Sequence, residues 1–228
     1  MKKILTFLMI LTLALFLVAC NDDENGTDDT GQVEITNDER LDEDESVVRV
    51  NDTEIKGDKY NQIYTQVKLM MDQYGQDVSD LDLVKEQSVS ILVEQELINQ
   101  DAKNLGIEVT DEEAQIEIDT MKEETDEEQF SQVLKTYQIT EDEFKNQLVD
   151  DLVTVKYMDH EFDVEVTDEE IEEYYNQLKE QNPERIAELD TEEVEEEIKS
   201  ILSRQEQSEQ LAERVAELRE SAEIEILI

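Results

Sequence analysis

The chain has 228 residues, with 64 Asp and Glu against 19 Lys and Arg, which gives a formal net charge of −45 at pH 7. Nucleic-acid binding is excluded, because proteins that bind phosphate backbones need clustered Lys and Arg and this surface repels them. The single cysteine excludes an internal disulfide, so the core has to hold without a covalent cross-link. The acidity suits a saline medium and equally suits plain solubility, and the composition leaves both explanations open.

The first 19 residues have the pattern of an export signal peptide. Two lysines precede the apolar stretch 4–18, which is shorter than the ~20 residues that a membrane-spanning helix needs. Residues 17–20, Leu-Val-Ala-Cys, resemble the lipobox of bacterial lipoproteins, in which cleavage between Ala19 and Cys20 leaves a cysteine that carries a diacylglyceryl group. An ordinary cleaved signal is the alternative. We expect a protein that two acyl chains hold on the extracytoplasmic side of the cell membrane of a Gram-positive bacterium.

The segment after Cys20 differs from the rest of the chain. Residues 21–46 are strongly charged, contain few apolar side chains and have no helical stripe, which predicts disorder. We therefore expect residues 20–46 to form a lipidated, disordered acidic tether, and the folded module to occupy residues 47–228.

Two short strands are predicted at the two ends of this module. Residues 47–50 are mostly β-branched, and the turn sequence Asn51-Asp52 separates them from a second extended segment at 53–55. Residues 222–228 alternate, so that Ile224, Ile226 and Ile228 share one face. Because a lone strand leaves its backbone groups unpaired, we expect the first and last segments to pair in a small sheet of two or three strands.

Nearly everything between these strands has helical periodicity, so the predicted fold class is mainly α. A first helix carries an apolar stripe from Tyr60 to Tyr74 and ends at Gly75, and a second runs from about Leu83 to Leu105. Four later helices are predicted to begin with capping boxes, in which Thr is followed three residues later by Glu. These pairs are Thr110 and Glu113, Thr125 and Glu128, Thr140 and Glu143, and Thr167 and Glu170. Pro183 separates them from a long helix and closing strand at about 184–228.

The residues of the chain do not indicate catalysis. His160 is the only histidine, the one cysteine is assigned to lipidation, and the five glycines form no phosphate-binding loop. A metal site built on His or Cys is excluded, and no cofactor is expected. With 64 acidic residues, paired carboxylates arise by chance at almost any spacing and indicate solvated faces. We therefore expect the protein not to be an enzyme.

Three segments together resemble a known family. VVRVNDTEIKGDKY at 47–60, EVTDEEIEEYYNQL at 165–178 and AEIEILI at 222–228 are similar to the N-terminal chaperone module of the PrsA and SurA type. The resemblance implies a helical module that holds unfolded or partly folded secreted proteins in an apolar cradle. It also implies that members often carry a histidine-containing parvulin prolyl-isomerase domain after the segment that resembles 165–178. Here that segment leads through Pro183 directly to the last helix, so isomerase activity is not expected.

The predicted client-binding residues lie on the first helix. They are Tyr64, Leu69, Met70, Met71 and Tyr74, because adaptable methionine and aromatic side chains suit varied client segments. Ordinary core packing is the alternative for each of them. The predicted partners are unfolded secreted polypeptides and the membrane, through the anchor on Cys20, and a homodimer is one form that the sequence permits. A lipid-anchored helical scaffold with one dedicated partner is the alternative function.

Overall fold

The computed structural model describes residue 33 and residues 35–181 and 191–228. The lipobox with Ala19 and Cys20, and the predicted break at Pro183, lie outside these residues. Seven α-helices and a small sheet make up the described part, which confirms the predicted fold class. In chain order the elements are η2 (Asn37–Glu39), β1 (Ser46–Val50), β2 (Thr53–Lys56), α2 (Gly57–Gln73), α3 (Leu81–Asn104), α4 (Asp111–Thr125), α5 (Glu127–Tyr137), α6 (Glu141–Glu161), α7 (Asp168–Gln181), α9 (Thr191–Ser221) and β3 (Ile224–Ile226).

The sheet confirms that the two ends of the module pair. β1 lies between β2 and β3 and is antiparallel to both, with Val50 opposite Thr53 on one side and Val48 opposite Ile226 on the other. Asn51 turns the hairpin with a φ of 55°, a left-handed conformation that asparagine adopts more readily than most residues. It also exchanges hydrogen bonds with the backbone of Glu223, which fastens the C-terminal strand to the hairpin.

The main core lies between the sheet and helices α2 and α3. Its fully buried members include Val47, Val48 and Val50 of β1, Met71 of α2 and Leu92 of α3. A second core joins α4, α5 and α6, where the rings of Phe130 and Phe144 meet edge to face with centroids 5.4 Å apart. A third core joins α3, α6 and α9, where Ile98, Ala102 and Tyr157 are buried and Leu211 and Val215 of α9 pack against them. The apolar stripes predicted from the sequence thus pack in three clusters.

The segment before β1 is ordered, so the prediction of disorder up to Ser46 does not hold for residues 35–46. Ile35 and Leu41 pack against the main core, and Asn61 makes two hydrogen bonds of 2.9 Å with the backbone of Leu41. Gly57 allows this approach, because a Cβ there would lie 2.1 Å from the carbonyl oxygen of Asp42. Asp42 and Gly57 are 15 positions apart and Leu41 and Asn61 are 20 apart, and composition alone does not reveal such contacts.

Three of the four predicted capping boxes are confirmed, those at Thr110, Thr140 and Thr167. The box at Thr125 is wrong, because α4 continues through Thr125 and its hydroxyl donates to the carbonyl of Met121. Asp126 caps α5 instead, and its carboxylate accepts from the N–H groups of Glu128 and Gln129, each at 2.9 Å. Thr125 and Glu128 have the spacing of a capping box, but the N-cap of α5 is Asp126, one residue later than that box requires.

Candidate functional site

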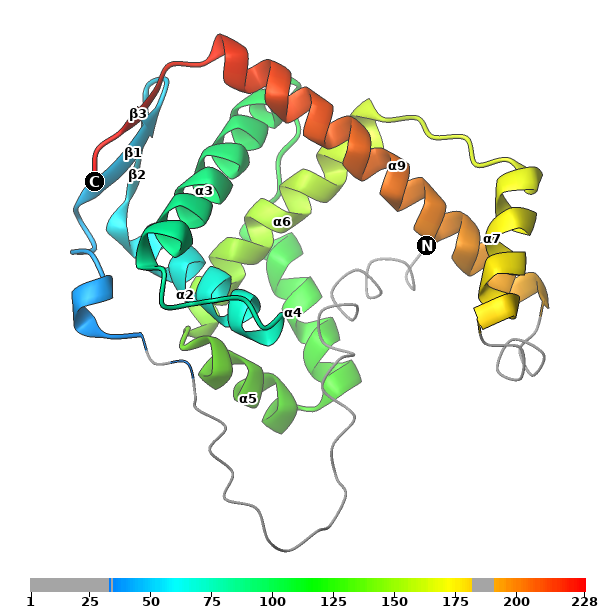
Figure 1. Cartoon of the computed structure of the whole chain (residues 1–228), viewed down its shortest axis with the longest axis horizontal. Coiled ribbons are helices and arrows are strands. Elements are labelled where there is room, and N and C mark those ends of the chain that lie inside the picture. Colours follow the sequence, from blue (N-terminus) through cyan, green and yellow to red (C-terminus); the bar gives the residue numbers. More distant parts are fainter. Residues whose placement is uncertain (1–32, 34, 182–190) are drawn as a thin grey trace, which may run out of the picture.

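The molecule divides into a body and an arm (Figure 1). The body comprises the sheet, α2 to α6 and the second half of α9, that is residues 35–161 and 208–228. The arm comprises residues 162–181 and 191–207, which include α7 and the first half of α9. Figure 1 shows α9 crossing α3 and α6 and continuing to α7, which packs against it at the end farthest from the sheet.

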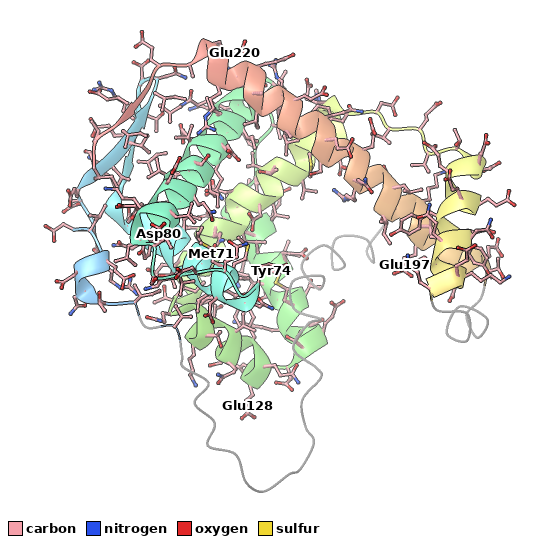
Figure 2. All side chains as sticks on the ribbon, in the orientation of Figure 1. Met71, Tyr74, Asp80, Glu128, Glu197 and Glu220 are labelled. Atoms are coloured by element: carbon pink, nitrogen blue, oxygen red, sulfur yellow. The ribbon has the colours of Figure 1, made fainter. Side chains whose placement is uncertain are left out.

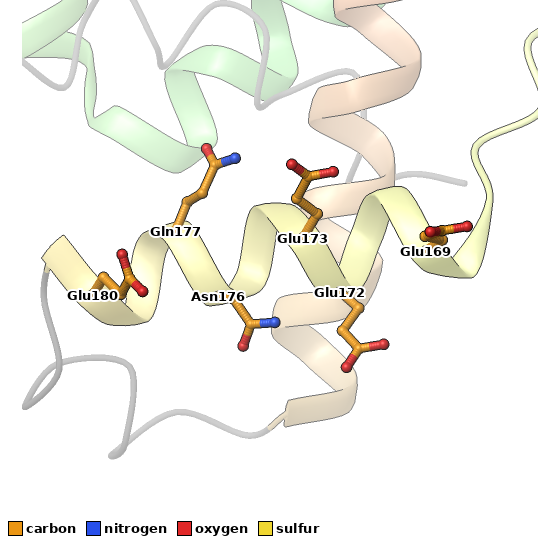
Figure 3. Close-up of a pocket in the computed structure, with 6 residues that line it drawn as sticks. All are labelled: Glu169, Glu172, Glu173, Asn176, Gln177 and Glu180. Atoms are coloured by element: carbon orange, nitrogen blue, oxygen red, sulfur yellow. The ribbon is translucent and has the colours of Figure 1, made fainter.

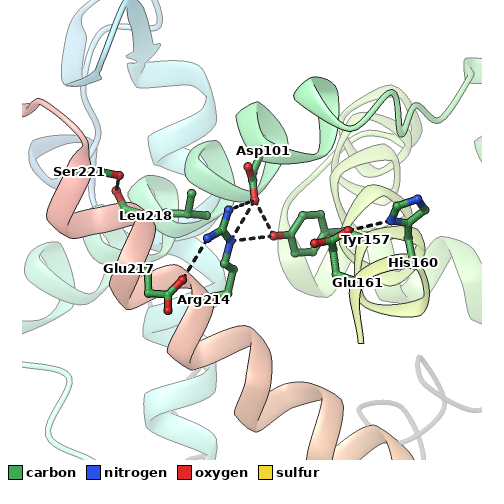
Figure 4. Close-up of polar contacts among 8 residues, drawn as sticks. All are labelled: Asp101, Tyr157, His160, Glu161, Arg214, Glu217, Leu218 and Ser221. Atoms are coloured by element: carbon green, nitrogen blue, oxygen red, sulfur yellow. Dashed lines mark hydrogen bonds and ion pairs between the residues drawn. The ribbon is translucent and has the colours of Figure 1, made fainter. Parts of the chain in front are cut away.

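A polar junction fixes α9 to the body (Figure 4). The hydroxyl of Tyr157 on α6 donates to Asp101 Oδ2 on α3 at 2.6 Å, and Arg214 of α9 donates to the same oxygen at 3.0 and 3.2 Å. Tyr157 is completely buried. Burial, and to a smaller extent the hydrogen bond to Asp101, raises the pKa of its phenol to about 12. The phenol therefore stays neutral beside the ion pair of Arg214 with Asp101, and these contacts hold α9 against α3 and α6.

A second anchor lies where the arm begins. Gln207 of α9 is buried, and its amide donates to Asp159 Oδ1 and to the carbonyl of Phe162, each at 3.4 Å. The ring of Phe162 packs edge to face on Tyr157 with centroids 6.0 Å apart. These contacts hold the chain leaving α6 against the middle of α9. Beyond them, no residue of Asp168–Gln181 is buried, and α7 packs through half-buried side chains against the part of α9 that carries the buried Val194 and Ile198.

His160 contacts the neighbouring carboxylate of Glu161 at the end of α6. Its Nδ1 lies 2.8 Å from Glu161 Oε1, and the side chain is 56% exposed at the end of α6 (Figure 4). No group of three or more metal-ligating side chains occurs within the described ranges.

The five predicted client-binding residues fall into two groups. Tyr64 and Met71 are buried, and the Tyr64 hydroxyl donates to Glu39 Oε2 at 2.8 Å. Met70 is 46% exposed and Tyr74 67% exposed, while Leu69 is half-buried. Figure 2 shows Met71 and Tyr74 near the end of α2. A client that meets this conformation can touch Met70, Tyr74 and part of Leu69, and Tyr64 and Met71 support them from within.

Other exposed apolar side chains escaped the sequence analysis. They are Leu81 and Leu83 at the start of α3, Leu105 after its end, and Ile116 on α4. Leu83 and Leu105 were expected to lie within one helix, and Leu81 is the first residue of that helix in the structure. The apolar pattern of this helix did not indicate that these three leucines are exposed. The amphipathic period of each helix carries the only signal, because Leu83 and Ile116 lie off the buried stripes of α3 and α4.

Two hollows lie along the arm, and both are acidic. The first follows the surface of α7 and is lined by Glu169, Glu172, Glu173, Asn176, Gln177 and Glu180 (Figure 3). The second is a groove of about 580 Å³ between the segment that precedes α7 and the middle of α9. Its lining residues are Asp163, Val164, Glu165, Val166, Glu170, Leu202, Gln205, Glu206, Glu209 and Gln210. Neither lining includes a Lys or Arg, so both hollows favour positive charge.

None of the helices in the described ranges is sufficiently long and apolar to span a bilayer.

Comparison with known proteins supports the assignment that the sequence suggested. The SurA-like N-terminal domain family matches residues 1–158. The chain is also 30% identical over 190 residues to the protein named Foldase protein PrsA from Caldanaerobacter subterraneus subsp. tengcongensis, an alignment that covers 78% of this chain. It covers 53% of that relative, so the chain spans about half the relative's length. The chain therefore belongs to the SurA-like N-terminal domain family, a family of chaperones and foldases.

Proposed function

We propose that this protein is an extracytoplasmic chaperone of the holdase type, anchored to the membrane through a lipid on Cys20 and without prolyl-isomerase activity. The observation that carries the proposal is the family match over residues 1–158, combined with a fold that presents exposed apolar side chains and no metal-ligating cluster in its described part. Its clients are unfolded or partly folded secreted polypeptides, which it binds without covalent chemistry.

The proposed client surface begins at the end of α2. Met70 and Tyr74 are exposed there, one helical turn apart, and therefore lie on the same side of the helix. An unbranched methionine side chain adapts to differently shaped partners, and a tyrosine offers both an apolar ring and a hydroxyl. The net charge of −45 opposes self-association of the chaperone while a client is bound.

Aggregation assays test the proposal. Several unrelated chemically unfolded proteins are diluted into buffer with and without the full chain, and light scattering is followed over time. Suppression for most of them is the expected result. Met70→Ser with Tyr74→Ser weakens it, whereas the matched exposed pair Ile226→Ser with Leu227→Ser leaves it unchanged. Activity toward one client and no other overturns the proposal in favour of a scaffold with one dedicated partner.

Anchoring and the absence of isomerase activity have separate tests. Cys20→Ser releases the protein from membranes if the anchor is a lipid on that thiol, while circular dichroism of the purified variant keeps the parent spectrum. A protease-coupled assay of a proline peptide gives the uncatalysed rate when the chain is added. Membrane retention of the Cys20→Ser protein, or a proline isomerisation rate that rises with chain concentration, contradicts the corresponding part of the proposal.

A further inference from the structure

The chain between α6 and α7 is an extended segment with one face against α9. Residues 162–167 belong to no helix or strand, and their burial alternates, with Phe162, Val164 and Val166 half-buried and Asp163 and Glu165 exposed. That period of two is the pattern of a β-strand with one face covered. Val164 and Val166 line the groove together with Leu202 of α9, so the segment forms one wall and α9 the other.

Both ends of this segment are fixed, but its middle has no backbone partner. The Phe162 N–H donates to Met158, and its carbonyl accepts from Gln207. Thr167 is held in the capping box of α7. Between them, the N–H and C=O groups of residues 163–166 form no hydrogen bond with any other described residue. The segment thus resembles an unpaired edge strand, which is a template for another extended chain.

The charge of the groove selects what can pair with this edge. Five carboxylates line it, those of Asp163, Glu165, Glu170, Glu206 and Glu209, and its lining includes no cation. Burying an anionic segment there costs electrostatic energy, whereas Lys or Arg side chains of an incoming strand offset the repulsion among these carboxylates. Val164, Val166 and Leu202 accommodate the apolar side chains of the incoming strand, which point to the face opposite its Lys or Arg side chains.

We propose that this groove binds an extended, cationic segment of a client polypeptide by adding it as a strand beside residues 163–166. Backbone pairing makes the contact independent of most of the client's sequence, and the acidic lining favours segments in which Lys or Arg alternates with apolar residues. Four residues of edge span about 13 Å at ~3.3 Å per residue, enough for a strand of four or five residues. The inference rests on the proposed chaperone function and assigns one client-binding site to it.

The test uses the full chain and a fluorescent eight-residue peptide in which lysine alternates with valine. Fluorescence anisotropy measures Kd at low and high salt. Binding should weaken as salt screens the exposed charges. A peptide N-methylated at every amide, which cannot donate a hydrogen bond from either edge, should bind about tenfold more weakly. Equal affinity for the methylated peptide overturns strand addition and leaves only charge attraction.

Matched variants locate the site. Glu206→Gln with Glu209→Gln should weaken binding of the unmethylated peptide about fivefold. The control pair Glu172→Gln with Glu173→Gln removes the same charge from the other hollow on α7 and should have no effect. Thermal unfolding establishes that all variants remain folded. Equal losses from the two pairs assign binding to the overall field of the protein and overturn the site.

The same variants distinguish this inference from the proposed function. If the chain suppresses aggregation but the groove variants bind the peptide like the parent protein, the inference fails and the chaperone proposal stands. If the chain does not suppress aggregation of any client, the chaperone proposal fails, whatever the peptide does. Peptide-independent self-association that the groove variants abolish identifies a second copy of the chain as the occupant and also overturns the inference.

Discussion

The body and the arm are built from the same kind of amphipathic helix, but they are stabilised very differently. The body buries whole side chains between the sheet, α2 and α3, and it joins the two ends of the module through β1 and β3. The arm has no buried residue on α7, and it meets the body where Gln207 bonds Asp159 and where the ring of Phe162 packs on Tyr157. Regions with few buried apolar contacts open at lower free energy than the core. We therefore expect the body to be rigid and α7 of the arm to open more easily than the body.

The largest expected effect is in the body. Leu92→Ala removes a fully buried side chain from the main core and should lower the free energy of unfolding by about 2–5 kcal/mol. Denaturant unfolding followed by circular dichroism measures this loss. Ile116→Ala, at a side chain that is 59% exposed, is the control and should change stability by less than about 0.5 kcal/mol. Similar losses from both variants would contradict a distinct body core.

The segment before β1 tests whether residues 35–46 belong to the body. Burial raises the pKa of Glu39, but the ion pair with Lys68 and the bonds from Thr36 and Tyr64 outweigh it and lower the pKa from 4.5 to about 2. Both side chains of the ion pair are 7% exposed. Glu39→Gln should therefore cost up to about 3 kcal/mol at neutral pH.

The pH dependence of that cost has a defined sign. Because the folded-state pKa lies below the unfolded one, the carboxylate stabilises the fold fully above pH 4.5, and this contribution is lost as the pH falls toward 2. The difference in stability between the parent protein and Glu39→Gln should shrink across this window in a series of urea titrations. A difference in stability that stays constant between pH 4.5 and pH 2 would mean that protonation of Glu39 does not weaken its ion pair with Lys68.

An intermediate effect is expected at the junction between the two regions. Arg214→Met keeps the aliphatic stem but leaves Asp101, whose side chain is 13% exposed, without its cation, which should cost about 1–2 kcal/mol. Distances between spin labels on α7 and α4 should also spread. Arg219→Met removes an exposed pair with Glu94 at 3.5 Å and serves as the control, with less than about 0.5 kcal/mol lost. An unchanged distance distribution for Arg214→Met would show that the junction does not position the arm.

The smallest global effect belongs to the arm. Leu178→Ala truncates a half-buried side chain of α7 and should lower overall stability by less than about 1 kcal/mol. Hydrogen exchange should nevertheless accelerate along α7 and remain unchanged in α3, because the arm opens without unfolding the body. Faster exchange in α3 as well would mean that the two regions unfold as one unit.

Local patterns predicted much of the fold. The alternation of Ile224 and Ile226 predicted a strand that pairs with the start of the module, and the structure places Ile226 opposite Val48. Threonine and glutamate three residues apart predicted the starts of three helices, since both partners of a capping box lie within one turn. The exception at Thr125 arose because Asp126 competes for the same amide groups and lies one residue closer to them.

The candidate sites depended on contacts that no local pattern contains. Periodicity placed Met70, Met71 and Tyr74 on one helical stripe, but the packing of α3 against α2 decided that Met71 is buried and that Met70 and Tyr74 are exposed. The alternation in Asp163-Val164-Glu165-Val166 is present in the sequence, yet its significance depends on α9 lying beside it and on the lack of a strand partner among the described residues.

The sequence by itself determined the helical class, the closing strand and the family, because each depends on neighbouring residues or on one repeated spacing. The tertiary structure alone decided that residues 35–46 join the body, that Arg214 meets Asp101 and Tyr157, and that a groove opens between residues 163–166 and α9. These features join residues from 15 to more than 100 positions apart. Their formation depends on the free energy of packing, which exists only when the whole chain is folded.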